Sequence, residues 1–251
     1  MVWGAPEAHE TPADLYDAGF HPASPNLDRF TLCRHLRVPL PGFTPSSENR
    51  RILRKAAHLR ATLVPRAEFD FHDARRESWL GFAHHRFGPG IMPRERLDGL
   101  MSGRVITHLL VFEEPAATPD AAPREVGVVL LYLEPPRMAH YYYAFYDLAH
   151  PNRSLGLGLM TSAVLHFRDA GFRWLYIGTC YSRRALYKDQ FDGLEFFNGV
   201  AWSTDRAQLR HLVQRDARST HLLQDPEFLA RESGLDALAA RSRHRLRHPA
   251  A

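Results

Sequence analysis

One short segment limits the possible folds more than any other feature of the chain. Residues 138–147 are rich in aromatic side chains and have the composition of a strand. The glycine-containing segment 153–158, RSLGLG, follows, and then come a helical pattern at about 157–170 and an apolar strand pattern at 174–181. A strand, a helix and a second strand in this order predict one crossover within a sheet.

The glycines of this segment have two possible roles. Gly156 and Gly158 allow the backbone to turn tightly and to present N–H groups at the start of the helix, where an anion such as phosphate is attracted. A tight turn without a ligand explains the same residues. Arg153 lies beside these glycines, and arginine forms paired hydrogen bonds with carboxylates and phosphates, as Arg183 and Arg184 further along the chain also would.

The rest of the chain predicts a mixed architecture. We expect a loose entry arm, an N-terminal α-rich portion and a mixed α+β sheet with flanking helices. The expected helices cover about 14–18, 48–60, 73–87, 93–101 and 183–191, and the expected strands cover 30–40, 105–112, 125–133 and a hairpin at 194–202. Three portions follow: 1–103, 104–215 and a helical basic tail at 216–251 that contains RSRHRLRH.

Almost all of the basic residues of the chain are arginines. The chain carries a formal net charge of +4, and of its 32 basic residues only Lys55 and Lys188 are lysines. A lysine that persists in such a chain marks a place where a compact amine of variable pKa is useful, although a surface lysine is the simpler interpretation. The mild positive charge permits contact with nucleic acid without demonstrating it.

Several classes of protein are excluded by composition. Two cysteines, Cys33 and Cys180, cannot build a disulfide framework or a four-cysteine zinc site, and they favour a reducing, cytoplasmic location. No uninterrupted apolar stretch is long enough for a membrane span, so we expect no membrane association. The acidic N-terminal segment lacks the apolar core of a secretory signal.

Two family resemblances rest on the second half of the chain. The Arg-x-x-Gly-x-Gly spacing of residues 153–158 resembles the pyrophosphate loop of the Gcn5-related N-acetyltransferase fold. Ala185-Leu186-Tyr187 with Phe191 resembles a later helix of that fold, although Gln190 replaces its glycine. This resemblance implies a mixed sheet of the acetyltransferase type and a general-acid role for Tyr187.

A closer resemblance, to the aminoacyl-tRNA–protein transferases (arginyl- and leucyl-transferases), covers roughly residues 30–202. Its C-terminal block consists of Ser154-Leu155-Gly156, Tyr176-Ile177-Gly178, Tyr187-Lys188-Asp189-Gln190-Phe191 and Trp202. Its N-terminal block consists of Leu36-Arg37-Val38-Pro39, Phe43-Thr44-Pro45-Ser46 and the basic run Arg50-Arg51-x-Leu53-Arg54-Lys55. Two ordered blocks at compatible spacing are much more specific than a glycine loop alone.

This resemblance implies transfer of an arginyl or leucyl group from aminoacyl-tRNA to the N-terminal α-amine of a protein, commonly one that begins with Asp or Glu, for degradation by the N-degron pathway. Aminoacyl-tRNA is then the co-substrate, no further cofactor is needed, and we expect a monomer. The implied catalytic residues are Tyr187 and Lys188. The expected substrate-binding residues are Arg153, Ser154, Leu155, Gly156, Gly158, Tyr176, Arg183 and Arg184, and the expected tRNA-binding residues are Arg50, Arg51, Arg54 and Lys55.

Departures from the family leave two alternatives open. Relatives carry a cysteine cluster implicated in metal binding, whereas here only Cys33 remains beside His35, so we expect no structural metal. The family's proline after the Tyr-Lys motif is replaced by Asp192-Gly193. A catalytically degenerate relative that binds tRNA or N-termini would explain the missing cysteines, and Gly158 favours an acyl-CoA-dependent N-acetyltransferase that uses acetyl-CoA. The aromatic residues 141–143 are a possible stacking platform for the terminal adenine of tRNA.

Overall fold

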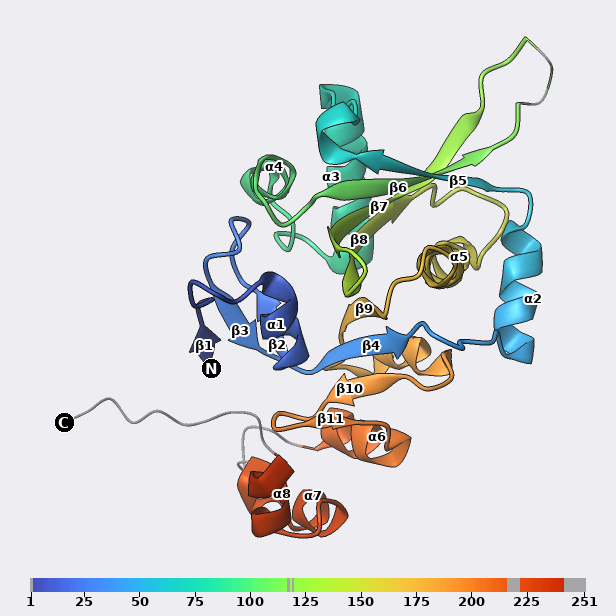
Figure 1. Ribbon diagram of the computed structural model, residues 1–251. Helices are drawn as coiled ribbons and strands as arrows, with labels where there is room; N and C mark the ends of the chain where they lie inside the picture. Colours follow the sequence, from blue (N-terminus) through green and yellow to red (C-terminus); the bar gives the residue numbers. More distant parts are fainter. Residues whose placement is uncertain (1, 117, 119, 216–221, 242–251) are drawn as a thin grey trace.

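An eight-stranded mixed sheet forms the centre of the molecule (Figure 1). The computed structural model describes residues 2–116, 118, 120–215 and 222–241, so most of the basic segment RSRHRLRH lies outside the described residues. The strand order is β11-β10-β4-β9-β8-β7-β6-β5, and every neighbouring pair is antiparallel except β8 and β9. The mixed α+β sheet predicted from the sequence is therefore confirmed.

The predicted crossover is the part of the fold that positions the site. β8 (Met138–Tyr146) leads through α5 (Leu155–Asp169) to β9 (Trp174–Thr179), which lies parallel to β8. The two strands pair only from Met138↔Trp174 to His140↔Tyr176, and beyond these positions they separate. The helix begins at Leu155 rather than near residue 157, so both glycines lie in its first turn instead of in a loop.

The basic helix α2 (Ser47–Ala56) packs against α5. Ser46 caps it by accepting a hydrogen bond from the Asn49 amide at 3.1 Å, and the Asn49 side chain accepts from the Ser46 amide in return. The helix ends at Ala56 rather than near residue 60, because residues 60–65 form the edge strand β5 (Arg60–Pro65) beside β6 (His108–Glu114). This strand was not predicted from the sequence.

The predicted strand at 30–40 is two strands in different sheets. β3 (Phe30–Leu32) lies between β1 (Trp3–Gly4) and β2 (Phe20–Pro22), whereas β4 (His35–Pro39) lies in the central sheet. The chain bends between them, where the His35 amide donates to the Cys33 carbonyl at 2.9 Å. Because β4 and β5 pair with strands of the 104–215 portion, these first two portions of the chain share one sheet.

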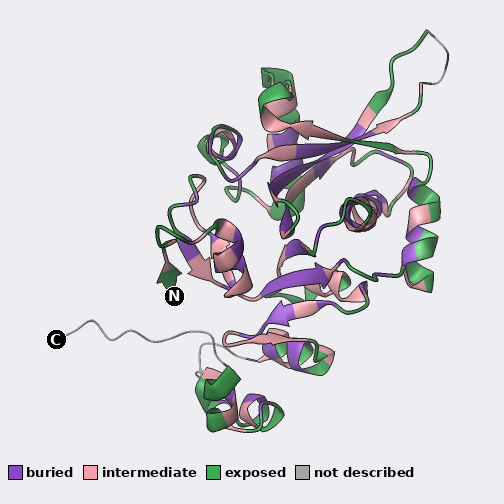
Figure 2. Cartoon of the chain, viewed as in Figure 1, coloured by how far each residue is buried: buried purple, intermediate pink, exposed green. Residues whose placement is uncertain are grey.

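Helices cover both faces of the sheet and enclose two apolar cores (Figure 2). One core lies between the sheet and α5. The other gathers α1 (Pro12–Asp17), α3 (Asp73–Phe87) and α4 (Arg94–Ser102). The remaining elements are β7 (Arg124–Glu134), β10 (Glu195–Phe197), β11 (Trp202–Ser203), α6 (Arg206–Gln214), α7 (Pro226–Arg231), α8 (Leu235–Arg241) and the 3-10 helices η1 (Arg66–Glu68), η2 (Arg183–Gln190) and η3 (Leu222–Gln224). Within the described residues, every helix is too short or too polar to cross a membrane.

Candidate functional site

A cavity of about 580 Å³ occupies the gap where β8 and β9 separate. It brings together residues of β8 and β9, the N-terminus of α5, η2 and the end of α3. Of the residues that we expected in a site, Arg153, Ser154, Gly156, Tyr187, Lys188 and the aromatic residues 141–143 line it. Two blocks of the chain about 30 residues apart therefore meet at one place, as the motifs indicated.

The N-terminus of α5 faces this cavity with free hydrogen-bond donors. Gly156 and Leu157 line the cavity, and the amide of neither has a partner among the residues that the structure describes. The first turn of α5 contains no acidic residue, so no side chain of its own occupies the positive end of the helix. A Cβ atom at Gly156 would lie 2.6 Å from the Tyr146 ring, so glycine permits this ring to pack against the helix start.

Gly158 has a structural role instead. Its amide donates to the Ser154 carbonyl at 2.8 Å inside the helix, and a Cβ atom here would lie 3.2 Å from the Cβ atom of Ala56 in α2. Leu155 is likewise buried in the core between α5 and the sheet. The structure thus places neither of these two expected substrate-binding residues in the cavity, because they lie on the buried sides of α5.

Among the residues that the structure describes, three cations line the cavity and no Asp or Glu does. They are Arg86 at the end of α3, Arg153 and Lys188, and neither arginine has an ion-pair partner within the described part of the chain. Arg86 was not predicted from the sequence, because its position beside the cavity depends on how α3 packs. The site therefore has the electrostatic character of an anion-binding pocket.

Lys188 is a cation of this cavity whose pKa is lowered by burial. Burial lowers its pKa to about 8, because its ammonium group has lost most of its contact with water. The Nζ atom donates a hydrogen bond to the Thr179 carbonyl at 3.2 Å. Gly178, where φ is +83°, leaves room for this amine, because a Cβ atom there would lie 3.2 Å from Lys188 Nζ. Lys188 thus exchanges protons readily near neutral pH.

Tyr187 precedes Lys188 on η2 and is half-exposed at the cavity. Burial of its ring, followed by the proximity of Tyr146, raises the pKa of its phenol, so the hydroxyl keeps its proton at neutral pH. Arg183 and Arg184 begin the same helix but are exposed and do not line the cavity. η2 thus directs only its second half toward the site.

An aromatic wall forms the opposite side of the cavity. Its rings contact one another at centroid distances of 5.3 Å between Tyr142 and Tyr143, 5.7 Å between Phe87 and Tyr143, and 4.8 Å between Phe82 and Tyr146. A bulge in β8 explains why consecutive tyrosines reach one cavity, since Tyr141 pairs with Leu131 and Tyr143 with Leu130, which leaves Tyr142 without an opposite residue.

Tyr176 does not reach the cavity. It is fully buried on the other face of β9, and its hydroxyl donates to Asp17 at 3.0 Å and accepts from Arg37 at 3.3 Å. Alternation along the strand explains this, because the next residue, Ile177, does line the cavity. Tyr176 was an expected substrate-binding residue, and the structure gives it a role in packing the N-terminal segment onto the sheet.

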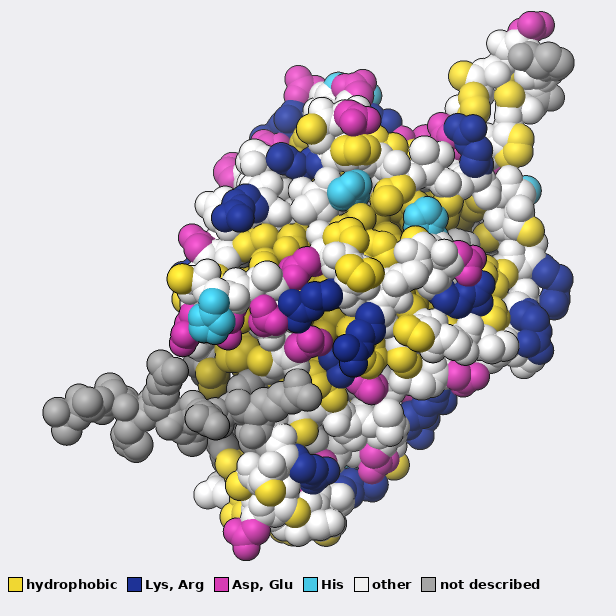
Figure 3. Space-filling view, in the orientation of Figure 1, with side chains coloured by type: hydrophobic (Ala, Val, Ile, Leu, Met, Phe, Trp, Pro, Cys, Tyr) yellow, Lys and Arg dark blue, Asp and Glu magenta, His cyan; other side chains and the backbone are white. Residues whose placement is uncertain are grey.

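The four basic residues of α2 lie on the surface. Arg50, Arg51, Arg54 and Lys55 are all exposed, and Lys and Arg side chains gather over α2 at the right of Figure 3. Arg51 is engaged by Glu48 through two hydrogen bonds of 2.6 and 2.7 Å. The Asn152 side chain donates to the Lys55 carbonyl at 3.3 Å, so the end of α2 is joined to the segment that carries Arg153.

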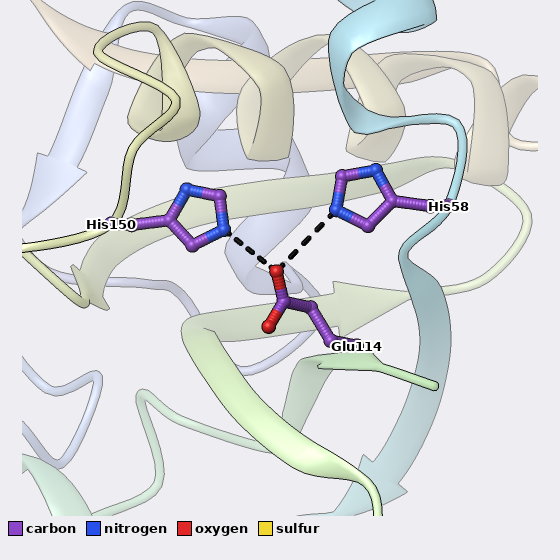
Figure 4. A group of neighbouring side chains, drawn as sticks. All are labelled: His58, Glu114 and His150. Carbon is purple, nitrogen blue, oxygen red and sulfur yellow. Dashed lines mark hydrogen bonds and ion pairs between the residues drawn. The ribbon is translucent and has the colours of Figure 1, made fainter. Parts of the chain in front are cut away.

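One cluster of possible metal ligands stands near this junction (Figure 4). His150 Nε2 lies 3.0 Å and His58 Nε2 lies 3.6 Å from Glu114 Oε1. His150 Nδ1 accepts a hydrogen bond from the Asn152 amide at 3.1 Å, so Nε2 carries the ring proton and donates a hydrogen bond to Glu114. Hydrogen bonds from His150 and Arg124 lower the pKa of Glu114 to about 2.

Cys33 and His35 do not assemble a metal centre either. In the described ranges, ligand atoms of three such side chains come within 4.8 Å of one another only at His58, Glu114 and His150. Cys33 is buried, and burial raises its thiol pKa to about 12, which disfavours the thiolate that a metal requires. The chemistry of these two residues therefore does not fit a metal site at this place.

The chain is similar in sequence to known transferases. No family model matches the chain. It is 26% identical over 200 residues to the aspartate/glutamate leucyltransferase of Parvibaculum lavamentivorans, covering 75% of this chain and 78% of that one. It is 25% identical over 206 residues to the aspartate/glutamate leucyltransferase of Pseudomonas paraeruginosa, covering 76% and 81%. These names agree with the resemblance that the motifs indicated.

Solved structures match more weakly. FemX superimposes with a TM-score of 0.42 at 10% identity, over 66% of this chain and 59% of that one. The C-terminal domain of a protein assigned as a lysylphosphatidylglycerol synthetase from Agrobacterium fabrum superimposes with a TM-score of 0.44 at 18% identity, over 70% and 54%. The chain thus covers little more than half of each of these structures, and no conclusion about this protein is based on them.

Proposed function

We propose that this chain, which is similar to aspartate/glutamate leucyltransferases, transfers an aminoacyl group from aminoacyl-tRNA to the N-terminal α-amine of an acceptor protein. The observation that carries this proposal is the cavity between β8 and β9, which unites Tyr187, Lys188 and the start of α5. Cations and helix N–H groups line it, and no carboxylate of the described part of the chain does, so it suits substrates that bear phosphates or carboxylates.

The charge of the cavity favours leucine over arginine as the transferred residue. An arginyl side chain would meet Arg86, Arg153 and Lys188 and would find no carboxylate among the lining residues. A leucyl side chain would instead contact apolar groups such as Met160 and Ile177. The relatives named above are leucyltransferases, which supports the same choice.

The same cations suit an acceptor that begins with Asp or Glu. A side-chain carboxylate in the cavity would be neutralised by an arginine that has no ion-pair partner among the described residues. The relatives are named for aspartate and glutamate. An N-terminal addition of this kind is the step that the N-degron pathway requires. Because ribosomes use the same donor, we expect the protein to act in the cytoplasm. We also expect it to act as a monomer.

The proposed reaction is aminolysis of an ester. The acceptor nitrogen forms a bond with the ester carbonyl carbon, the bond from that carbon to the ribose oxygen breaks, and the ribose hydroxyl gains a proton. An α-amine has a pKa of about 8, which matches the pKa of about 8 of Lys188, so Lys188 in its neutral form accepts the ammonium proton with little change in free energy. Tyr187 donates a proton to the leaving ribose oxygen and regains one from the acceptor nitrogen, which loses its second proton as the amide forms.

The tRNA would approach across α2. Its exposed basic residues, Arg50, Arg54 and Lys55, can contact backbone phosphates, which positions a tRNA without reading its sequence. The α2 surface is joined to the start of α5 through Asn152, so the acceptor end can continue into the cavity. The aromatic wall would then receive the terminal adenine by stacking.

The acyl-CoA alternative loses the feature that favoured it. Gly158 was the second loop glycine, and its amide is used inside α5 while its missing side chain admits Ala56. We retain acetyl-CoA transfer and binding without catalysis as outcomes of the experiment.

A donor competition tests the proposal. Purified protein receives labelled aminoacyl-tRNA from a total pool, or labelled acetyl-CoA, together with peptides that begin with Asp, Glu, Arg or Ala. We expect leucine to move from tRNA to the α-amine of the Asp and Glu peptides. Transfer from acetyl-CoA alone would assign an N-acetyltransferase, and tRNA binding without movement of either label would assign a binding protein.

Two substitutions test the roles of the site residues. Tyr187→Phe should reduce the transfer rate by about 10²-fold or more, since a general acid contributes about 10²–10⁴-fold, while tRNA binding persists. The matched control is Tyr181→Phe, an exposed tyrosine whose hydroxyl accepts from the Arg34 amide at 2.8 Å outside the cavity. Lys188→Arg keeps the charge but cannot release a proton, so it should also be slow. Full activity in both Tyr187→Phe and Lys188→Ala would refute this mechanism.

A further inference from the structure

A buried hydrogen bond reaches the cavity from the N-terminal segment. His140 is the last residue of β8 that pairs with β9, so it stands at the point where the two strands separate, and it lines the cavity. Its Nδ1 lies 2.7 Å from the hydroxyl of Tyr16 in α1. Both residues are almost completely buried. Neither of them has a part in the transfer steps described above.

The direction of this hydrogen bond determines which nitrogen of His140 carries the proton. Burial raises the pKa of Tyr16 far above its usual range, so its hydroxyl keeps a hydrogen to donate. Among the described residues, His140 Nδ1 is the only acceptor in reach of that hydroxyl. Burial also lowers the pKa of His140 well below its usual range, so the ring is neutral and, with Nδ1 as acceptor, its one N–H is at Nε2.

The Nε2–H group is left available to a ligand. It has no hydrogen-bond partner within the described ranges, yet it is not among the fully enclosed unpartnered nitrogens, which belong to His21 and His35. Since His140 lines the cavity, Nε2 is the ring atom that a bound molecule can reach. The rings of His21 and His35 lie 5.2 and 5.0 Å from the ring of His140, and burial keeps both neutral by lowering their pKa values.

We propose that His140 is a catalytic hydrogen-bond donor, whose Nε2–H binds the carbonyl oxygen of the aminoacyl ester, and that Tyr16 is a positioning residue that fixes its tautomer. This inference rests on the proposed function. When the acceptor nitrogen bonds to the carbonyl carbon, the carbonyl oxygen acquires negative charge, which a donor already in place stabilises. The imidazole keeps its proton throughout, while the ammonium proton leaves through Lys188, and Tyr187 gives a proton to the ribose oxygen and regains one from the acceptor nitrogen.

Nuclear magnetic resonance of ¹⁵N-labelled histidine tests the tautomer without reference to activity. At neutral pH the His140 signals, assigned by their loss in His140→Gln, should show a protonated Nε2 and an unprotonated Nδ1. Tyr16→Phe should convert them to a mixture of tautomers, whereas Tyr132→Phe should not. Tyr132 is a matched control, because it is a buried tyrosine stacked on Tyr16 whose hydroxyl donates to Glu134 at 3.2 Å. A proton on Nδ1 in the wild-type protein would overturn the proposal.

Single-turnover transfer from leucyl-tRNA tests the catalytic part. His140→Leu should slow the transfer step by about 10²–10³-fold, which is the effect of removing one oxyanion donor, with little change in the apparent affinity for leucyl-tRNA. His140→Gln, which can still present an N–H group, should recover part of this loss. Equal rates for wild type and His140→Leu would refute the role of His140 alone. Absence of transfer by the wild-type protein would refute the proposed function and the catalytic role with it, whereas the tautomer would be decided by the spectra.

Discussion

At the scale of single residues, the site depends on side chains whose pKa values burial has changed. Lys188 lines the cavity with an ammonium group that has lost most of its water and retains the Thr179 carbonyl as an acceptor at 3.2 Å. Its pKa falls from 10.5 to about 8 in the folded state. A residue that must be buried to perform its chemistry therefore reduces the stability of the fold that contains it.

This cost has a definite pH dependence. Between pH 8 and 10.5 the folded protein has released the Lys188 proton while the unfolded chain still holds it, so wild-type stability should rise with pH in this window. Relative to Lys188→Met, the gain should be about 3 kcal/mol, from 1.36 kcal/mol per pKa unit. Urea unfolding at pH 7 and pH 10.5 measures it. A stability difference between the two proteins that stays constant over this range would contradict the buried environment.

At the scale of elements, the contact between α2 and α5 places the basic surface beside the cavity. The contact is close because Gly158 has no side chain, and a Cβ atom there would lie 3.2 Å from Ala56 Cβ. The segment between β8 and α5 is fixed as well, by the hydrogen bonds of His150 to Glu114 and of Asn152 to Lys55. The glycine pattern of the sequence thus supports helix packing as much as ligand binding.

Substitutions at two helical glycines separate these effects. Gly81 lies within α3, and a Cβ atom there would have no neighbouring atom within 4 Å, so Gly81→Ala should stabilise the protein by up to about 1 kcal/mol through helix propensity. Gly158→Ala should gain less, because of the contact with Ala56. Gly158→Leu should cost about 1–3 kcal/mol by forcing the helices apart. Urea midpoints of the three variants check this order, and a stable Gly158→Leu protein would contradict it.

At the scale of the whole molecule, Arg37 joins the N-terminal segment to the sheet. Its guanidinium lies between Trp174 and Trp202, at 3.8 and 3.9 Å from the ring centroids, and pairs with Asp17 and Glu195 at 3.0 and 2.7 Å. These partners belong to α1 and to β9, β10 and β11, and α1 lies far from the three strands in the chain. Arg37 and Trp202 both belong to the motifs of the family resemblance, and the structure gives them this shared structural role.

Removal of this cation should therefore weaken the fold globally. Arg37→Met leaves Asp17 and Glu195 without the cation between them and should cost about 3 kcal/mol, the lower end for a buried pair because both carboxylates are partly exposed. Arg37→Lys keeps the charge but not the planar stacking, so its stability should lie between those of the wild-type protein and Arg37→Met. Chemical denaturation measures both losses. If Arg37→Met unfolds at the same denaturant concentration as the wild-type protein, the packing of the two tryptophans is sufficient for stability without the cation.

Local patterns in the sequence predicted many of the elements and one half of the site, but they did not predict the edge strand β5 or the division of residues 30–40 between two sheets. Aromatic strands, a helix after Ser154 and the motif around Tyr187 and Lys188 all reflect interactions between residues near one another in the chain. Tertiary structure decided which of these residues share a cavity. Leu155, Gly158 and Tyr176 left the expected site because they face buried sides of their elements, and Arg86 and His140 entered it. Burial, the bulge at Tyr142 and the separation of β8 from β9 arise only when distant segments pack together, so no local pattern could have predicted them.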